Sequence, residues 1–143
     1  MILNRQRKVR LAMRPLRTFL NQAQRELKIA DSEITVALVS DAEMARWNQA
    51  YRKKKGPTDV LSFPATAGAA RNRGAGAQEL LGDIAIAPET ARRYARKYGR
   101  SLHAEIRMLM LHGVLHLMGY DHESDNGQMN RIEQRLRRRL GIA

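Results

Sequence analysis

The chain has 143 residues and a formal net charge of +12, with 26 Lys and Arg against 14 Asp and Glu. This length predicts one domain over residues 1–143, and the 43% of hydrophobic residues excludes a wholly disordered chain. The chain has no cysteine, which excludes disulfides, thiolate metal sites and a cysteine nucleophile. We expect a cytoplasmic protein whose positive charge attracts an anionic partner such as a nucleic acid.

Hydrophobic periodicity, capping residues and turn residues predict the elements of an α+β domain. In chain order they are a short edge strand at 1–4, a helix at 13–29, a strand at 33–39, a helix at 40–49, strands at 59–63 and 80–87, and helices at 88–98, 101–118 and 125–140. The segment 65–78 is rich in Ala and Gly and predicts a flexible loop.

Two observations favour a soluble protein with no membrane partner. The arginine-rich segment 1–20 has no continuous apolar run, so it is unlike a secretory signal. The longest apolar stretch, 108–118, contains two histidines and a glycine. It is shorter than the about twenty apolar residues that a membrane-spanning helix needs.

Three of the four histidines lie close together in the sequence, at His112, His116 and His122. The first two are four residues apart on a predicted helix, so they share one face and can bind one ion. Gly119 can adopt the left-handed conformation that ends a helix, which lets the chain fold back and bring in His122. The spacing H-x3-H-x2-G-x2-H equals that of the metzincin zinc peptidases. We therefore expect one Zn²⁺ per chain, in a site that keeps an open position for chemistry.

The alternative interpretation is that these are core histidines. Two imidazoles in an apolar helix, with a third just beyond it, would be costly to bury without a shared partner, which favours metal binding. Gly113 follows the first histidine, where HExxH peptidases carry a glutamate as general base. The spacing therefore predicts the metal but not the usual peptidase chemistry.

Two acidic residues, Asp121 and Glu123, flank His122. Carboxylates at these positions can orient an imidazole or activate a water molecule. They can also belong, with Asp125, to an acidic cluster that stabilises the positive N-terminus of the last helix. Both interpretations remain open for Asp121 and Glu123.

A second cluster is basic and consists of Arg52, Lys53, Lys54 and Lys55, on a predicted loop before a strand. Such a run is typical of a phosphate-binding surface, although a solvated basic loop is the alternative for the individual lysines. Aromatic residues make up 5% of the chain, too few for a stacking platform of several bases. The composition therefore favours contacts to an RNA or DNA backbone over base recognition.

The segments that carry these residues resemble the YbeY family of bacterial rRNA-maturation endoribonucleases. The matching segments are HGVLHLMGYDH at 112–122, PTDVLSFP at 57–64, LGDI at 81–84, Tyr-Arg at 51–52 and Asn-Arg-Gln at 4–6. The resemblance covers essentially the whole chain in order, and the histidine segment combined with PTDVLSFP is highly specific.

The resemblance implies a zinc-dependent, single-strand-directed endoribonuclease in 16S rRNA 3′-end maturation and ribosome quality control. It implies a small mixed β-sheet with helices on both sides and the metal helix against the sheet. The family's zinc ligands fall on His112, His116 and His122, and its functional arginine falls on Arg52. The chain departs from the family at Lys53 and Lys55, which replace the more usual Gly and Asp and make the loop more basic.

Two other functions stay open at this point. The histidine spacing allows a metallopeptidase-like hydrolase, against which Gly113 and the charge of +12 both count. The basic surface also allows a ribosome-assembly factor that binds RNA and holds a mainly structural zinc.

Overall fold

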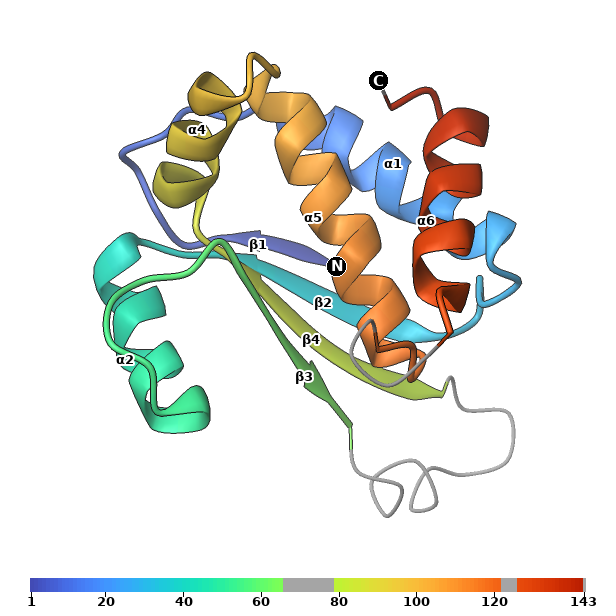
Figure 1. Ribbon diagram of the computed structural model, residues 1–143, viewed down its shortest axis with the longest axis horizontal. Helices are drawn as coiled ribbons and strands as arrows, with labels where there is room; N and C mark the ends of the chain where they lie inside the picture. Colours follow the sequence, from blue (N-terminus) through green and yellow to red (C-terminus); the bar gives the residue numbers. More distant parts are fainter. Residues whose placement is uncertain (66–78, 122–125, 143) are drawn as a thin grey trace.

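The structure is a computed structural model that describes residues 1–65, 79–121 and 126–142 (Figure 1). The described elements are β1 (Ile2–Asn4), α1 (Met13–Glu26), β2 (Glu33–Leu38), α2 (Asp41–Arg52), β3 (Val60–Pro64), β4 (Leu80–Ile86), α4 (Pro88–Lys97), α5 (Leu102–Leu117) and α6 (Gln128–Arg139). The predicted loop at 65–78 lies, except for its first residue, outside the described residues.

The four strands form one mixed sheet in the order β1-β2-β4-β3. β2 pairs in parallel with both β1 and β4, whereas β3 pairs antiparallel with β4. The α+β class and the small mixed sheet are therefore as predicted. β3 is an edge strand, so β4 is its only neighbour among the described strands.

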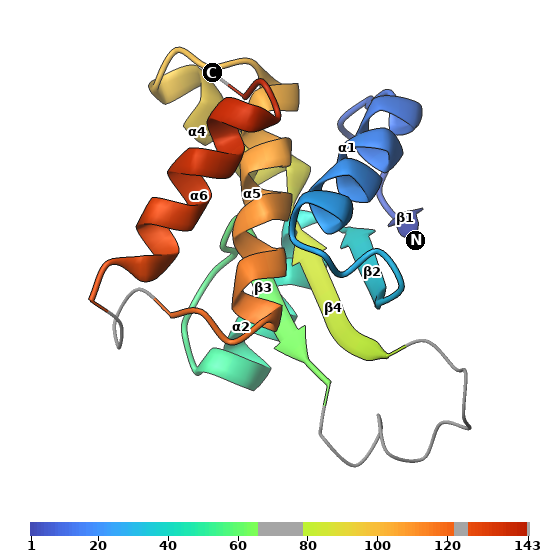
Figure 2. The same cartoon turned by 90° about the vertical axis from the view of Figure 1, so that its right-hand side faces the viewer.

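Helices cover both faces of the sheet, as the family resemblance implied (Figures 1 and 2). On one face the strand residues Val36, Ile84 and Ile86 belong to the main core, which α1, α5 and α6 complete. On the other face Leu61 packs with Met44 of α2 in a smaller cluster. The alternation of side chains along each strand separates the two clusters, because successive residues point to opposite faces.

Helix α5 is the centre of the main core. It contacts α1, α4, α6, β3 and β4, and its residues Ile106, Met110, Leu111 and Leu115 are fully shielded from solvent. Ser101 caps its N-terminus by accepting a hydrogen bond from the Ala104 N–H at 3.1 Å. A helix that is apolar on nearly every side is buried on nearly every side, as its sequence predicts.

The predicted end of α1 and the predicted start of α6 are each wrong by three residues. α1 ends at Glu26 instead of residue 29, because Lys28 adopts a left-handed backbone with φ 62° that cannot continue a helix. α6 begins at Gln128 instead of residue 125, after Gly127, which has φ 91°. No helix in the described part of the chain is both long and apolar enough to cross a lipid bilayer.

Candidate active site

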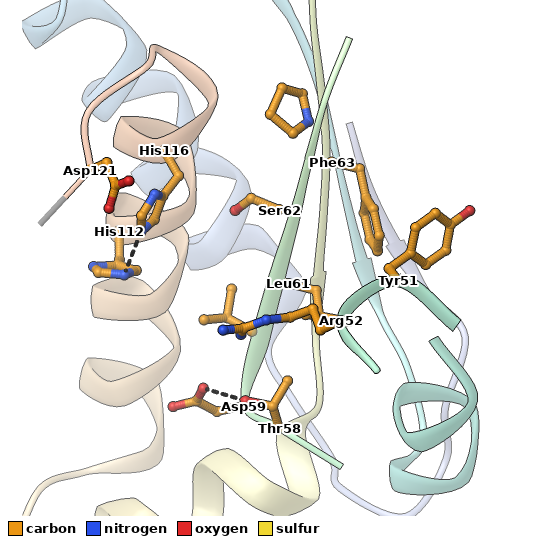
Figure 3. A pocket seen from close by; sticks show the side chains of 12 residues that line it. Tyr51, Arg52, Thr58, Asp59, Leu61, Ser62, Phe63, His112, His116 and Asp121 are labelled. Atoms are coloured by element: carbon orange, nitrogen blue, oxygen red, sulfur yellow. Dashed lines mark hydrogen bonds between the residues drawn. The ribbon is translucent and has the colours of Figure 1, made fainter. Parts of the chain in front are cut away.

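A pocket of about 850 Å³ opens between the C-terminal end of α2, the edge strand β3 and the second half of α5 (Figure 3). Its lining includes Arg52 from α2, Asp59 before β3, and His112 and His116 from α5. Asp121, which follows α5, also lines it. The fold thus brings together side chains from segments that are far apart in the sequence.

The two histidines of α5 converge on this pocket. The Nε2 atoms of His112 and His116 lie 3.0 Å apart, and the ring centroids are 4.6 Å apart with ring planes at 73°. This arrangement follows from the four-residue spacing on a helix, which places both rings on one face. The structure therefore confirms that the two imidazole rings lie side by side on one face of α5.

The donor atoms fit two positions of a tetrahedral zinc site. Zinc–nitrogen bonds of 2.0–2.1 Å in a tetrahedron place two nitrogens about 3.3 Å apart, close to the 3.0 Å separation of the two Nε2 atoms. The third predicted ligand, His122, and the flanking Glu123 lie outside the described residues. Within the ranges that the structure describes, no group of three His, Asp or Glu side chains gathers as a metal site.

Glu133 of α6 stands behind His112, away from the paired Nε2 atoms. Its Oε1 lies 3.6 Å from Nδ1 of His112, and the two side chains are 15% and 29% exposed. A carboxylate at this place is the usual partner that orients a metal-binding imidazole. Nothing in the sequence marks Glu133 as a site residue, because only the packing of α6 against α5 brings it to the histidine.

Arg52 occupies the last turn of α2, not the loop that was predicted for it. The helix runs three residues further than expected, to Arg52, and ends where Lys53 adopts a left-handed conformation with φ 56°. In Figure 3 the Arg52 side chain extends from α2 toward the α5 side of the pocket. The Arg52 backbone is thus held by α2 at the pocket wall.

The three lysines after Arg52 have a different environment. Lys53, Lys54 and Lys55 are all exposed, and none of them lines the pocket. The buried Asn48 holds their loop by donating a hydrogen bond from Nδ2 to the Gly56 carbonyl at 2.9 Å. The basic run that looks uniform in the sequence is therefore divided into one pocket residue and three surface charges.

Asp59 supplies a carboxyl group to the same pocket, although it is not among the site residues that the sequence predicts. Burial raises the pKa of Asp59, and the nearby Glu105 adds to the rise. The Val60 N–H and the Thr58 hydroxyl donate hydrogen bonds to the carboxylate and oppose the rise. Burial is the largest of these effects, so Asp59 holds a proton to a higher pH than an exposed aspartate does.

Gly113 faces the sheet and not the pocket. A Cβ atom at this position would lie 2.9 Å from two side-chain carbons of Ile84 on β4. A glutamate, which zinc peptidases use at this position, therefore has no room between α5 and the sheet. The packing supports the expectation that the usual peptidase base is missing.

The fold and the pocket define a small α+β protein with a histidine pair and an arginine at the edge strand of a mixed sheet. The family model described as Endoribonuclease YbeY matches residues 1–141. The chain belongs to the YbeY family.

Relatives across bacteria agree with this assignment. The protein named Endoribonuclease YbeY from Solibacter usitatus is 44% identical over 125 residues, which cover 87% of this chain and 76% of that protein. The protein of the same name from Koribacter versatilis is 37% identical over 142 residues, covering 99% of this chain and 86% of that one. The solution structure of TM1509 from Thermotoga maritima has a TM-score of 0.66 and 27% identity, covering 98% of this chain and 89% of that chain.

Proposed function

We propose that the protein is an endoribonuclease that cleaves single-stranded RNA in the pocket beside β3. The observation that carries the proposal is the convergence of His112, His116 and Arg52 on one pocket. Membership of the YbeY family and the names of the bacterial relatives support it. In line with the family, we propose the 3′ end of the 16S rRNA precursor as substrate, in ribosome maturation and quality control.

The proposed cofactor is one zinc ion, which His112, His116 and His122 would hold. When bound there, the ion would supply a Lewis acid for a phosphoryl oxygen. The described donor atoms support this proposal, because the two Nε2 atoms lie 3.0 Å apart, near the separation of two nitrogens bound to one tetrahedral zinc ion.

Arg52 binds the phosphate in this proposal. Its planar guanidinium can donate two parallel hydrogen bonds to phosphoryl oxygens and can stabilise the charge that develops as the phosphodiester is attacked. Lys53, Lys54 and Lys55 attract the RNA backbone from the surface beside the pocket.

A proton must move when the RNA chain is cut, and two carboxyl groups line the pocket, on Asp59 and Asp121. Asp59 is the better placed to exchange a proton with the substrate, since burial raises its pKa above that of an exposed aspartate. Asp121 is exposed and follows α5 directly.

The proposal is tested by incubating the protein with single-stranded RNA, duplex RNA and casein, and by analysing the RNA ends. We expect cleavage of the single strand only. A 2′,3′-cyclic phosphate would identify the RNA 2′-hydroxyl as the attacking group, and a plain monophosphate would identify water. RNA binding without any cleavage would instead support an assembly factor, and casein hydrolysis would support a peptidase.

A further inference from the structure

Three aromatic side chains gather beside Arg52, where β3 faces α2. Trp47 and Tyr51 are one helical turn apart on α2, and both contact Phe63 of β3. The ring centroids of Tyr51 and Phe63 are 4.8 Å apart with planes at 66°. Those of Trp47 and Phe63 are 6.1 Å apart at 87°. Edge-to-face contacts of this kind orient the rings relative to one another.

Tyr51 is the exposed member of this aromatic cluster. Its exposed fraction is 69%, whereas Trp47 and Phe63 are half-buried. Trp47 is in turn covered by the Arg5 guanidinium, which lies 5.9 Å from the ring centroid. The Tyr51 ring therefore packs against Phe63, which Trp47 contacts in turn, while much of the Tyr51 surface stays open to solvent.

The aromatic cluster is continuous with the candidate active site. Tyr51 and Phe63 line the same pocket as the histidines. Figure 3 shows the aromatic pair on one side of β3 and the histidines on the other, with Arg52 reaching from α2 toward α5. The alternation along β3 explains this separation, because Ser62 points to α5, with its Oγ 3.4 Å from the Gly113 carbonyl, while Phe63 points to α2.

A polymer that crosses the edge of β3 would therefore meet an aromatic ring, then a guanidinium, then the imidazole pair. Each nucleotide of a nucleic acid strand carries one base and one phosphate, so an aromatic ring beside a guanidinium suits the two parts of one nucleotide or of neighbouring ones. Arg52 is complementary to the phosphate, and an open aromatic ring next to it is complementary to the face of a base.

We infer that Tyr51, backed by Phe63, is a stacking subsite for one unpaired nucleobase adjacent to the phosphate that Arg52 binds. The inference rests on the proposed function, since it takes RNA as the ligand. Bases within an RNA duplex are stacked on their neighbours, so only an unpaired base presents a free face to Tyr51. The subsite thereby supplies a physical reason for preferring single-stranded RNA.

The test is a binding experiment that removes the base and the ring separately. Short single-stranded RNAs that each carry one abasic residue, at successive positions, are bound at fixed salt to the wild type and to Tyr51→Ala. For the wild type we expect one abasic position to weaken binding by roughly 5- to 150-fold, the range for loss of one stacked base. For Tyr51→Ala, the abasic residue at that position should cause no further loss.

Two variants serve as controls. Tyr51→Phe keeps the ring and should keep the dependence on the base. Tyr94→Ala removes a tyrosine that is 42% exposed on α4, outside the pocket lining, and should bind every RNA as the wild type does. Duplex RNA should bind equally well to the wild type and to Tyr51→Ala.

An abasic effect of equal size in the wild type and in Tyr51→Ala would overturn the inference. The readout is binding, so it separates this inference from the proposed activity. Dependence on the base without cleavage would preserve the subsite and refute the nuclease. Cleavage without dependence on the base would preserve the nuclease and refute the subsite. Absence of RNA binding by the wild type would refute both the subsite and the nuclease.

Discussion

Nδ1 of His112 on α5 and Oε1 of Glu133 on α6 lie 3.6 Å apart. Both side chains are largely shielded from water, at 29% and 15% exposure, so the carboxylate acts on the imidazole with little screening. A carboxylate on this side favours the tautomer with its proton on Nδ1. The lone pair of Nε2 then faces the pocket, which is the orientation that a metal ligand requires.

We predict that Glu133→Gln weakens zinc binding by about 10- to 100-fold, the usual cost of removing such an outer partner. The measurement is a competition between the protein and a chelator of known zinc affinity. Glu26→Gln is the matched control. The Glu26 carboxylate, on α1, also pairs with a residue of α6, but that residue is Arg139 and not a part of the histidine site. Equal zinc affinities for the Glu133→Gln variant and the wild type would show that Glu133 does not orient His112.

Arg52 and Lys54 should behave differently although they are close in the sequence. Arg52 lines the pocket and Lys54 does not. Arg52→Ala should lower the single-turnover cleavage rate by roughly a hundredfold or more, the cost of losing one donor to the transition state, and should weaken RNA binding far less. Lys54→Ala should weaken binding and flatten its salt dependence while saturated turnover stays near normal. If the two variants have the same kinetics, Arg52 is one charge of a basic surface and has no catalytic role.

The buried carboxyl of Asp59 should make the free energy of unfolding depend on pH. Its pKa is raised above the ordinary value of 3.8, so its contribution to stability is complete below that pH and is lost as the pH rises through the folded-state pKa. Asp59→Asn removes the charge and keeps an oxygen that accepts the hydrogen bond from the Val60 N–H. Urea unfolding should show the variant more stable than the wild type at neutral pH, with a smaller difference below pH 3.8. A difference in stability that does not change with pH would contradict the account.

The sequence predicts well those features that depend on local periodicity. The strand at 33–39 follows from alternation and the histidine pair from helical spacing, and each lies where its pattern placed it. The helix end at Arg52 was misplaced because the left-handed conformation of Lys53 is not a property that a lysine signals. One extra turn of helix moves Arg52 from a surface loop to the pocket wall.

Contacts between distant segments could not be predicted from residue patterns. Glu133 reaches His112 only because α6 packs on α5, and nothing in its own segment marks it. The low aromatic content argues against an extended stacking platform, yet the sheet edge brings the exposed Tyr51 against the half-buried Phe63. Their separation in the sequence conceals this pairing.

We propose that RNA is cut in the pocket that contains the histidine pair. The most direct measurement is single-turnover cleavage of a single-stranded RNA by the wild type and by His116→Ala, with RNA binding and zinc content measured on the same preparations. His116 contributes one of the two converging Nε2 atoms, so its loss should abolish zinc binding and cleavage while RNA binding through the basic surface remains. A His116→Ala variant that cleaves RNA at the wild-type rate would contradict the account.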